Sequence, residues 1–212
     1  MGTICLSEKD MIEPPKASFL GLPGEIRNFI YALLLTNTTS ISTGPLSSGQ
    51  IEPPTINVSI LRVCRQTHSE AVGLLYTLNR FRAHPSYLAS MPFLCDPARP
   101  VTSSSCTSLI RRFHIVVRLE CDPFWTRSSL AKAFSGIDEL EIEAWVASYG
   151  ICGLEVLESF TSVRRVRKAK VRGSHVDQIF SDWLEGVMES DEDSECIILP
   201  RANRSIWQHG NR

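Results

Sequence analysis

Residues 138–145 read Asp-Glu-Leu-Glu-Ile-Glu-Ala-Trp, "DELEIEAW". Leu140, Ile142 and Ala144 alternate with glutamates at positions 139, 141 and 143, and a period of two residues is typical of a strand with one buried face. The stretches "RFHIVVRLE" (112–120) and "RRVRKAKVRG" (164–173) are also typical of strands. The three predicted strands are therefore centred near residues 116, 141 and 168.

Helical patterns follow each of these strands. They cover 127–134 ("RSSLAKAF"), the region around 153–160 ("GLEVLESF") and a last helix whose apolar positions run from Val176 to Met188 at the helical period. Strand–helix units of this length favour right-handed crossovers and a small, mainly parallel sheet, loosely as in leucine-rich repeats. The fold class predicted for the chain is α/β.

The amino-terminal part has a different pattern. In "FLGLPGEIRNFIYALLL" (19–35), Pro23 suits a first helical turn and Glu25 faces the positive end of the helix dipole. A second helix is predicted from Ser59 to about Leu78, and Asn79 ends it before a short strand, "RFRAH", with Phe81 inward. The apolar positions of the first helix are Leu22, Ile26, Phe29, Ile30, Leu33 and Leu34, and those of the second are Leu61, Cys64, His68, Ala71 and Leu75.

These patterns divide the chain into segments. Residues 1–17 are predicted to be a flexible lead, and 18–84 a helical module with a long loop at 36–58 that is rich in Ser, Thr, Gly and Pro. The other segments are an irregular connection at 85–106, a β/α region at 107–190 and a polar tail at 191–212.

Composition narrows the classes of function. The 212 residues have a formal net charge of −1, so the chain has no global field that would attract nucleic acid or an anionic membrane. The longest apolar run, Ile30 to Leu35, is too short to span a bilayer. The chain has seven cysteines, none of them in a C-x-x-C pair, and we see no secretory signal. We therefore expect the cysteines to be reduced thiols. We expect a cytoplasmic or nuclear protein.

No pattern in the chain predicts catalysis. It has neither a glycine-rich phosphate loop nor a nucleophile elbow, and we expect no enzymatic activity, cofactor or small-molecule substrate. Cys64 and His68 are four residues apart, which suits either two metal ligands or a packed core histidine, and the latter is favoured. Cys152 and His175 are a nucleophile and base by residue type alone. We predict no metal site.

Two charge patterns have alternative interpretations. A basic run comprises Arg164, Arg165, Arg167, Lys168, Lys170 and Arg172. It fits a nucleic-acid-associated module, or an edge strand whose positive charges are neutralised by the acidic strand 139–143 and discourage aggregation. The four residues Glu25, Arg27, Arg65 and Glu70 are predicted to form a polar cluster that links the first two helices. The alternative is that these are separate solvated charges.

The first two helices carry motifs of a known group. Leu22-Pro23-x-Glu25-Ile26-Arg27-x-x-Ile30-Tyr31 precedes Cys64-Arg65-Gln66-x-x-x-Glu70-Ala71 and Leu75-Tyr76-x-x-Asn79-x-Phe81. This pattern resembles a large group of fungal F-box-like proteins, and the likeness covers about 19–83 and 153–188. The resemblance implies an F-box-type helical module that binds the Skp1 adaptor of a ubiquitin ligase, with the β/α region as a target surface.

The apolar positions of the first helix then have two interpretations. They are either plain core, which is favoured, or a docking face for that adaptor. In the docking interpretation the partner-facing residues are Leu22, Pro23, Ile26, Phe29 and Ile30.

Overall fold

The computed structural model describes residues 18–36, 56–84, 86–120, 123–146, 154–173 and 176–191. The predictions for 1–17, for 37–55 of the long loop and for 192–212 lie outside these residues. The elements are η1 (Phe19–Gly21), α1 (Gly24–Leu35), η2 (Val58–Arg62), α2 (Arg65–Leu78), β1 (Phe81–His84), β2 (Leu88–Phe93), α3 (Ser104–Thr107), β3 (Arg112–Arg118), α4 (Arg127–Phe134), β4 (Glu139–Trp145), α5 (Glu155–Glu158), η3 (Ser159–Ser162), β5 (Lys168–Gly173) and α6 (Gln178–Glu189).

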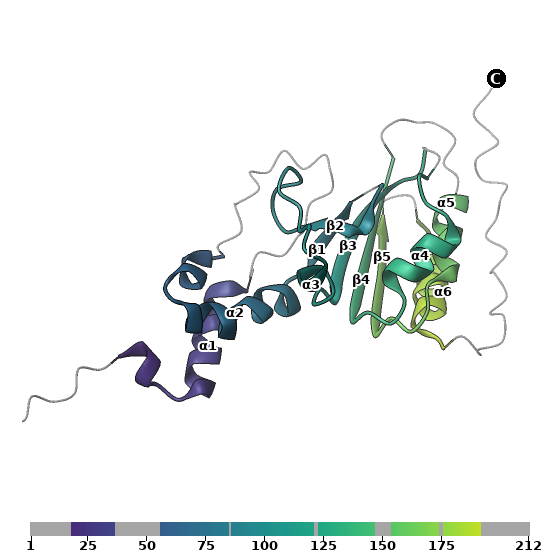
Figure 1. Cartoon of the computed structure of the whole chain (residues 1–212). Helices are drawn as coiled ribbons and strands as arrows, with labels where there is room; N and C mark the ends of the chain where they lie inside the picture. The colour runs from purple at the N-terminus through teal and green to yellow at the C-terminus, as the bar shows by residue number, and fades with distance from the viewer. Residues whose placement is uncertain are drawn as a thin grey trace, which may run out of the picture.

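A five-stranded sheet in the order β2-β1-β3-β4-β5 forms the centre of the fold (Figure 1). Strands β1, β3, β4 and β5 are parallel, and β2 pairs antiparallel with β1 at one edge. The predicted α/β class and the mainly parallel sheet are confirmed. The basic strand β5 lies at the other edge, beside the acidic strand β4, which is the arrangement expected in the edge-strand interpretation of the basic run.

One face of the sheet carries the main hydrophobic core. Ile115 of β3 and Ile142 of β4 are fully buried neighbours in register, and Val171 of β5 continues the row. Leu130 and Phe134 of α4 and Leu184 and Met188 of α6 belong to the same cluster. Because side chains alternate across a strand, the intervening residues point to the opposite face of the sheet, which is predominantly charged.

The structure corrects the prediction for residues 85–106. This segment contains strand β2 and the short helix α3 rather than irregular chain only. Pro92 interrupts the pattern of β2, and a proline is tolerated there because the strand lies at an edge. Strand β1 belongs to this sheet too, so the sheet begins at Phe81 and the helical module ends near Asn79 rather than at residue 84.

The second helix also differs from its prediction. Residues 58–62 form the 3₁₀ helix η2, and α2 starts only at Arg65, with Cys64 rather than Ser59 as its N-cap. The Thr67 amide donates to the Cys64 sulfur, and the Cys64 amide donates to the Thr67 hydroxyl. His68 was predicted on the apolar face of this helix, but it is exposed. The predicted inward position of Phe81 is confirmed.

No helix among the described residues has both the length and the apolar character needed to cross a lipid bilayer.

Candidate functional site

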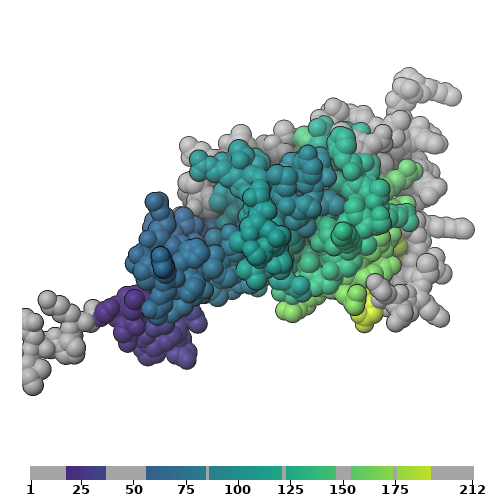
Figure 2. All heavy atoms as spheres, viewed as in Figure 1, coloured from purple at the N-terminus to yellow at the C-terminus, as the bar shows by residue number. Residues whose placement is uncertain are grey.

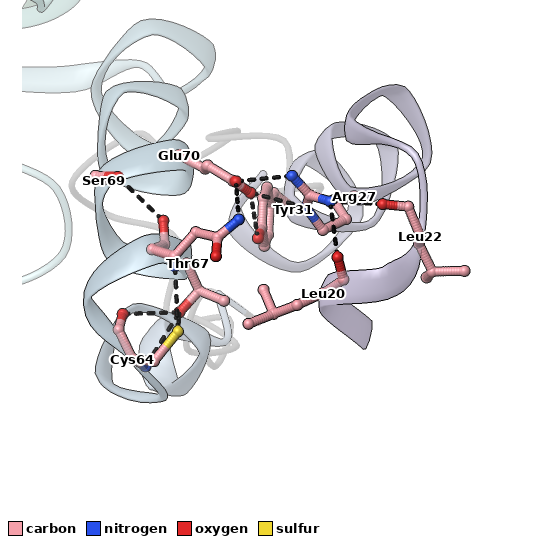
Figure 3. A network of polar contacts seen from close by, with 9 residues as sticks. Leu20, Leu22, Arg27, Tyr31, Cys64, Thr67, Ser69 and Glu70 are labelled. Atoms are coloured by element: carbon pink, nitrogen blue, oxygen red, sulfur yellow. Dashed lines mark hydrogen bonds and ion pairs between the residues drawn. The ribbon is translucent and has the colours of Figure 1, made fainter. Parts of the chain in front are cut away.

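A network of polar side chains joins α1 to α2 (Figure 3). Arg27 donates from Nε to Glu70 Oε2 at 2.9 Å and from Nη2 to Glu70 Oε1 at 2.8 Å, so the guanidinium binds the carboxylate with two parallel hydrogen bonds. Tyr31 donates to Glu70 Oε2 at 2.9 Å, and Gln66 donates to Oε1 at 2.9 Å. The Glu70 carboxylate therefore accepts four hydrogen bonds.

These donors stabilise the ionised form of the carboxylate. The hydrogen bonds from Arg27 and Gln66, aided by Tyr31, lower the pKa of Glu70 to about 2. Arg27 also donates to the backbone carbonyl of Leu22, so the same side chain binds the turn that precedes α1. The network fixes both the entry of the chain into α1 and the contact of α1 with α2.

The predicted polar cluster is thus correct for Arg27 and Glu70 and wrong in its other members. Glu25 and Arg65 lie exposed at the surface. Tyr31 and Gln66 supply the remaining bonds to Glu70. Tyr31 and Gln66 both belong to the sequence motif, but the motif does not indicate that they bind Glu70. A tyrosine within an apolar run is expected to pack by its ring, and Tyr31 also donates its hydroxyl hydrogen to Glu70.

Helices α1 and α2 run in the same general direction. Near the start of α1, Arg27 binds Glu70 in the first half of α2. At the other end, the Asn79 side chain, which follows α2, donates to the carbonyl of Leu35, the last residue of α1, at 2.6 Å. Asn79 also donates to the Leu75 carbonyl at 2.8 Å. The Asn57 amide donates to the Leu34 carbonyl at 2.8 Å, so the long connection begins and ends beside the end of α1. Residues 58–64, which include η2, then bring the chain back to the start of α2.

The apolar stripe predicted on α1 does not face α2. The buried side of α1 is formed by Tyr31 and Leu35, which pack with Ala71 of α2. Ile26, Phe29 and Leu33 are 48%, 65% and 66% exposed, and Leu22 is exposed as well. We call Leu22, Ile26, Phe29 and Leu33 the apolar α1 face. Their interpretation as core is wrong.

The exposure of the five predicted partner residues follows from this orientation. Leu22, Pro23, Ile26 and Phe29 are exposed, whereas Ile30 is half-buried. Leu33 was not predicted as a partner residue, yet its helical spacing extends the same face by one turn. Figure 2 shows α1 at one end of the described molecule, away from the sheet.

A second group of polar residues lies on the sheet, opposite the helices. Arg80 donates to both Glu139 and Glu141 of β4, and Arg172 of β5 pairs with Glu141 at 3.2 Å. Neighbouring strands place Arg82, His114, Glu141 and Lys170 in one row across the sheet. We define the charged sheet face as Arg80, Arg82, His114, Glu139, Glu141, Glu143, Lys168, Lys170 and Arg172.

His114 is the buried centre of this face. It is 2% exposed, and its Nε2 lies 3.1 Å from Oε2 of Glu143. Burial, together with the positive charges of Arg82, Arg80 and Arg172, lowers the pKa of His114 to about 4. The imidazole is therefore neutral at pH 7 and donates from Nε2 to Glu143, whose pKa is raised by burial.

The predicted basic run does not form one continuous patch. Arg164 donates to the backbone carbonyls of Thr161 and Val163, and Arg167 pairs with Asp138 at 3.2 Å. Arg165 has a positive φ of 58° before the strand begins. The members that lie on the charged sheet face are Lys168, Lys170 and Arg172.

The possible metal and nucleophile pairs of the sequence are not assembled by the described residues. The Cys64 sulfur caps α2 and His68 lies exposed, while Cys152 and His175 fall outside the described residues. Within the ranges that the structure describes, no three His, Cys, Asp or Glu side chains are grouped to hold a metal ion.

No protein-family model, curated protein or solved structure matches the chain.

Proposed function

We propose that the chain is a non-enzymatic protein-interaction module and that the apolar α1 face is its docking surface. The single observation that carries this proposal is the exposure of Ile26, Phe29 and Leu33 on consecutive turns of one helix. Large apolar side chains scattered singly on a surface are ordinary, but a contiguous row along a helix is typical of a protein interaction site.

The rigid attachment of α1 supports the same proposal. Arg27 and Tyr31 hold the opposite side of the helix against Glu70, so the apolar α1 face is presented by a helix that is already folded. A partner that binds it need not order the helix first, which removes one of the main costs of association. Burial of a large apolar side chain such as Phe29 then contributes about 1.5–3 kcal/mol.

The identity of the partner rests on the resemblance to F-box-like proteins. That resemblance includes Leu22, Pro23 and Ile26, which are exposed at the start of α1. We propose a Skp1-like adaptor as the partner, so that the chain recruits a target to a ubiquitin ligase.

A binding measurement with recombinant Skp1 tests this proposal. The 212-residue chain is immobilised, and Skp1 binding is followed by interferometry for the wild type and for Ile26→Asp with Phe29→Asp. We expect the double variant to lose at least about tenfold in affinity, because two charges would be placed in an apolar contact. Arg27, Tyr31 and Glu70 are unchanged in this variant, so α1 keeps its attachment to α2.

Ile179→Asp is the matched control. Ile179 is 64% exposed on α6, and the same kind of change there should leave Skp1 binding intact. Circular dichroism and thermal unfolding establish that each variant is folded. If the wild type does not bind Skp1, or if the folded double variant binds equally well, the adaptor proposal is wrong.

A further inference from the structure

The charged sheet face presents its positive charges outward. Glu141 is 4% exposed, while Arg172, which pairs with it, is 50% exposed. Lys168 and Lys170 are exposed as well. The glutamates of β4 thus lie beneath or between cationic side chains, and the accessible part of this face is more positive than its composition suggests.

The charges of this face do not balance. It contains five Lys or Arg residues and three glutamates, and His114 is neutral at pH 7. Arg80 and Arg172 are paired with glutamates. Lys168 and Lys170 are exposed and make no ion pair with any residue that the structure describes, whereas Arg82 is half-buried and its charge acts on Glu143. Two exposed cations of β5 are therefore available to a partner.

The spacing of these cations suits an extended chain. Lys168, Lys170 and Arg172 occupy alternate positions of β5, so their Cα atoms are about 6.6 Å apart along the strand. The neighbouring strand β4 already has carboxylates at the matching spacing. Its residues 139, 141 and 143 are glutamates that lie opposite these three cations in the strand register. A second extended segment with carboxylates at alternate residues would match the same ladder.

The backbone of β5 does not offer a free edge for that segment. The outward amides of Ala169 and Val171 donate to Glu189 Oε1 at 2.8 Å and to Glu185 Oε1 at 2.7 Å. Recognition must therefore come from the cationic side chains above the sheet rather than from addition of a strand.

We infer that the charged sheet face binds an acidic, extended polypeptide segment of a partner protein through Lys168 and Lys170 of β5. This surface is separate from the apolar α1 face, so the inference goes beyond the proposed function and does not depend on it. In an adaptor, it is where the recruited target would bind.

An acidic polypeptide fits this face better than nucleic acid does. Single strands are usually held by aromatic side chains on which bases stack. Trp145, which ends β4, already has the Arg118 guanidinium over its ring at 5.2 Å. A surplus of two positive charges is also small for a phosphate backbone, because such proteins typically make several phosphate contacts.

Fluorescence anisotropy with a labelled peptide of alternating Glu and Thr tests the inference on the full chain. We expect saturable binding at low salt that weakens as salt rises. Lys168→Gln with Lys170→Gln should weaken it by about tenfold. Arg127→Gln with Lys132→Gln, on the exposed surface of α4, removes the same charge elsewhere and should leave affinity unchanged.

A labelled peptide of alternating Lys and Thr, a duplex DNA and an anionic phosphatidylserine vesicle complete the comparison. Absence of binding to the Glu peptide, equal loss in both double variants, or tighter binding to duplex or vesicle than to the Glu peptide overturns the inference. The Ile26→Asp, Phe29→Asp variant should bind the Glu peptide like the wild type. Failure of this surface is therefore distinguishable from failure of the apolar α1 face.

Discussion

Arg27 and Glu70, 43 positions apart in the chain, form the two-bond ion pair that sets the rotation of α1 about its own axis. With Arg27 and Tyr31 turned toward α2, Ile26 and Phe29 point away from it. The pair therefore decides which side of the helix is available to a partner.

This ion pair should make the stability of the protein depend on acid. The pKa of Glu70 is lowered from its ordinary 4.5 to about 2 in the folded chain, so the folded state favours the carboxylate. The resulting stabilisation is complete above pH 4.5 and is lost as pH falls from 4.5 toward 2. We expect Glu70→Gln to lower the unfolding temperature at pH 7 and to flatten its acid dependence over that range, as measured by thermal unfolding. Glu25→Gln, at an exposed position, is the control, and an unchanged acid dependence in Glu70→Gln would contradict this role.

His114 should add a second pH dependence at higher pH. Its pKa is about 4 in the folded chain against an ordinary 6.5, and such a shift corresponds to about 3 kcal/mol in favour of the neutral imidazole. This stabilisation is complete above pH 6.5 and is lost as pH falls from 6.5 toward 4. An NMR titration of the imidazole should give the lowered pKa directly. Replacement of the exposed His68 by Gln should leave stability over this range unchanged, and titration of His114 near 6.5 would refute the prediction.

Two glycines should respond to alanine in opposite ways. A Cβ at Gly173 would lie 2.6 Å from the Ala144 carbonyl oxygen, because β5 approaches β4 closely at this point. Gly173→Ala should destabilise the protein by about 2 kcal/mol in urea unfolding. Gly186 lies in α6 with nothing near its added Cβ, and Gly186→Ala should stabilise it by up to about 1 kcal/mol. Equal effects at the two positions would contradict the observed packing.

The glutamates of α6 should keep β5 from pairing with a second copy of the chain. Glu185→Ala with Glu189→Ala would free the outward amides of Ala169 and Val171, and an open edge promotes association. We expect light scattering after gel filtration to show oligomers, most clearly in high salt, which screens the like charges of Lys168 and Lys170.

The oligomers of that variant should depend on the edge itself. Addition of Ala169→Pro removes one outward amide and should reduce association, because proline cannot donate to a new strand. Glu155→Ala with Asp182→Ala removes the same charge from exposed helical positions and should associate no more than the wild type. Association of this control, or persistence of oligomers with the proline, would argue against strand pairing.

Much of the sheet was predictable from sequence because its strands carry a local signal. The alternation at Leu140, Ile142 and Ala144 shows which face of β4 is buried, and the opposite charges of 139–143 and 168–172 indicate which strands are neighbours. Strand β2 has no such alternation, and Pro92 reduces its β propensity. Its place depends on pairing with β1, which is a tertiary contact.

The apolar α1 face was predictable in its residues but not in its orientation. Helical spacing groups Ile26, Phe29 and Leu33 on one side of α1, yet it does not specify whether that side faces the protein or the solvent. Contacts from Glu70 to Arg27 and Tyr31 decide this, and they come from a helix distant in sequence. The charged sheet face was only partly visible, since Arg80 and His114 carry no motif of their own.

The bond from the Asn57 amide to the Leu34 carbonyl separates two tasks of the segment between α1 and α2. A helix of 12 residues is about 18 Å long, and an extended residue spans about 3.3 Å, so roughly six residues are needed to bring the chain back to the start of α2. Residues 58–64 suffice for this return. Residues 37–55 are not needed to span that distance, so deletions within them should be accepted as long as the loop can still close, and length variation between homologues should concentrate there.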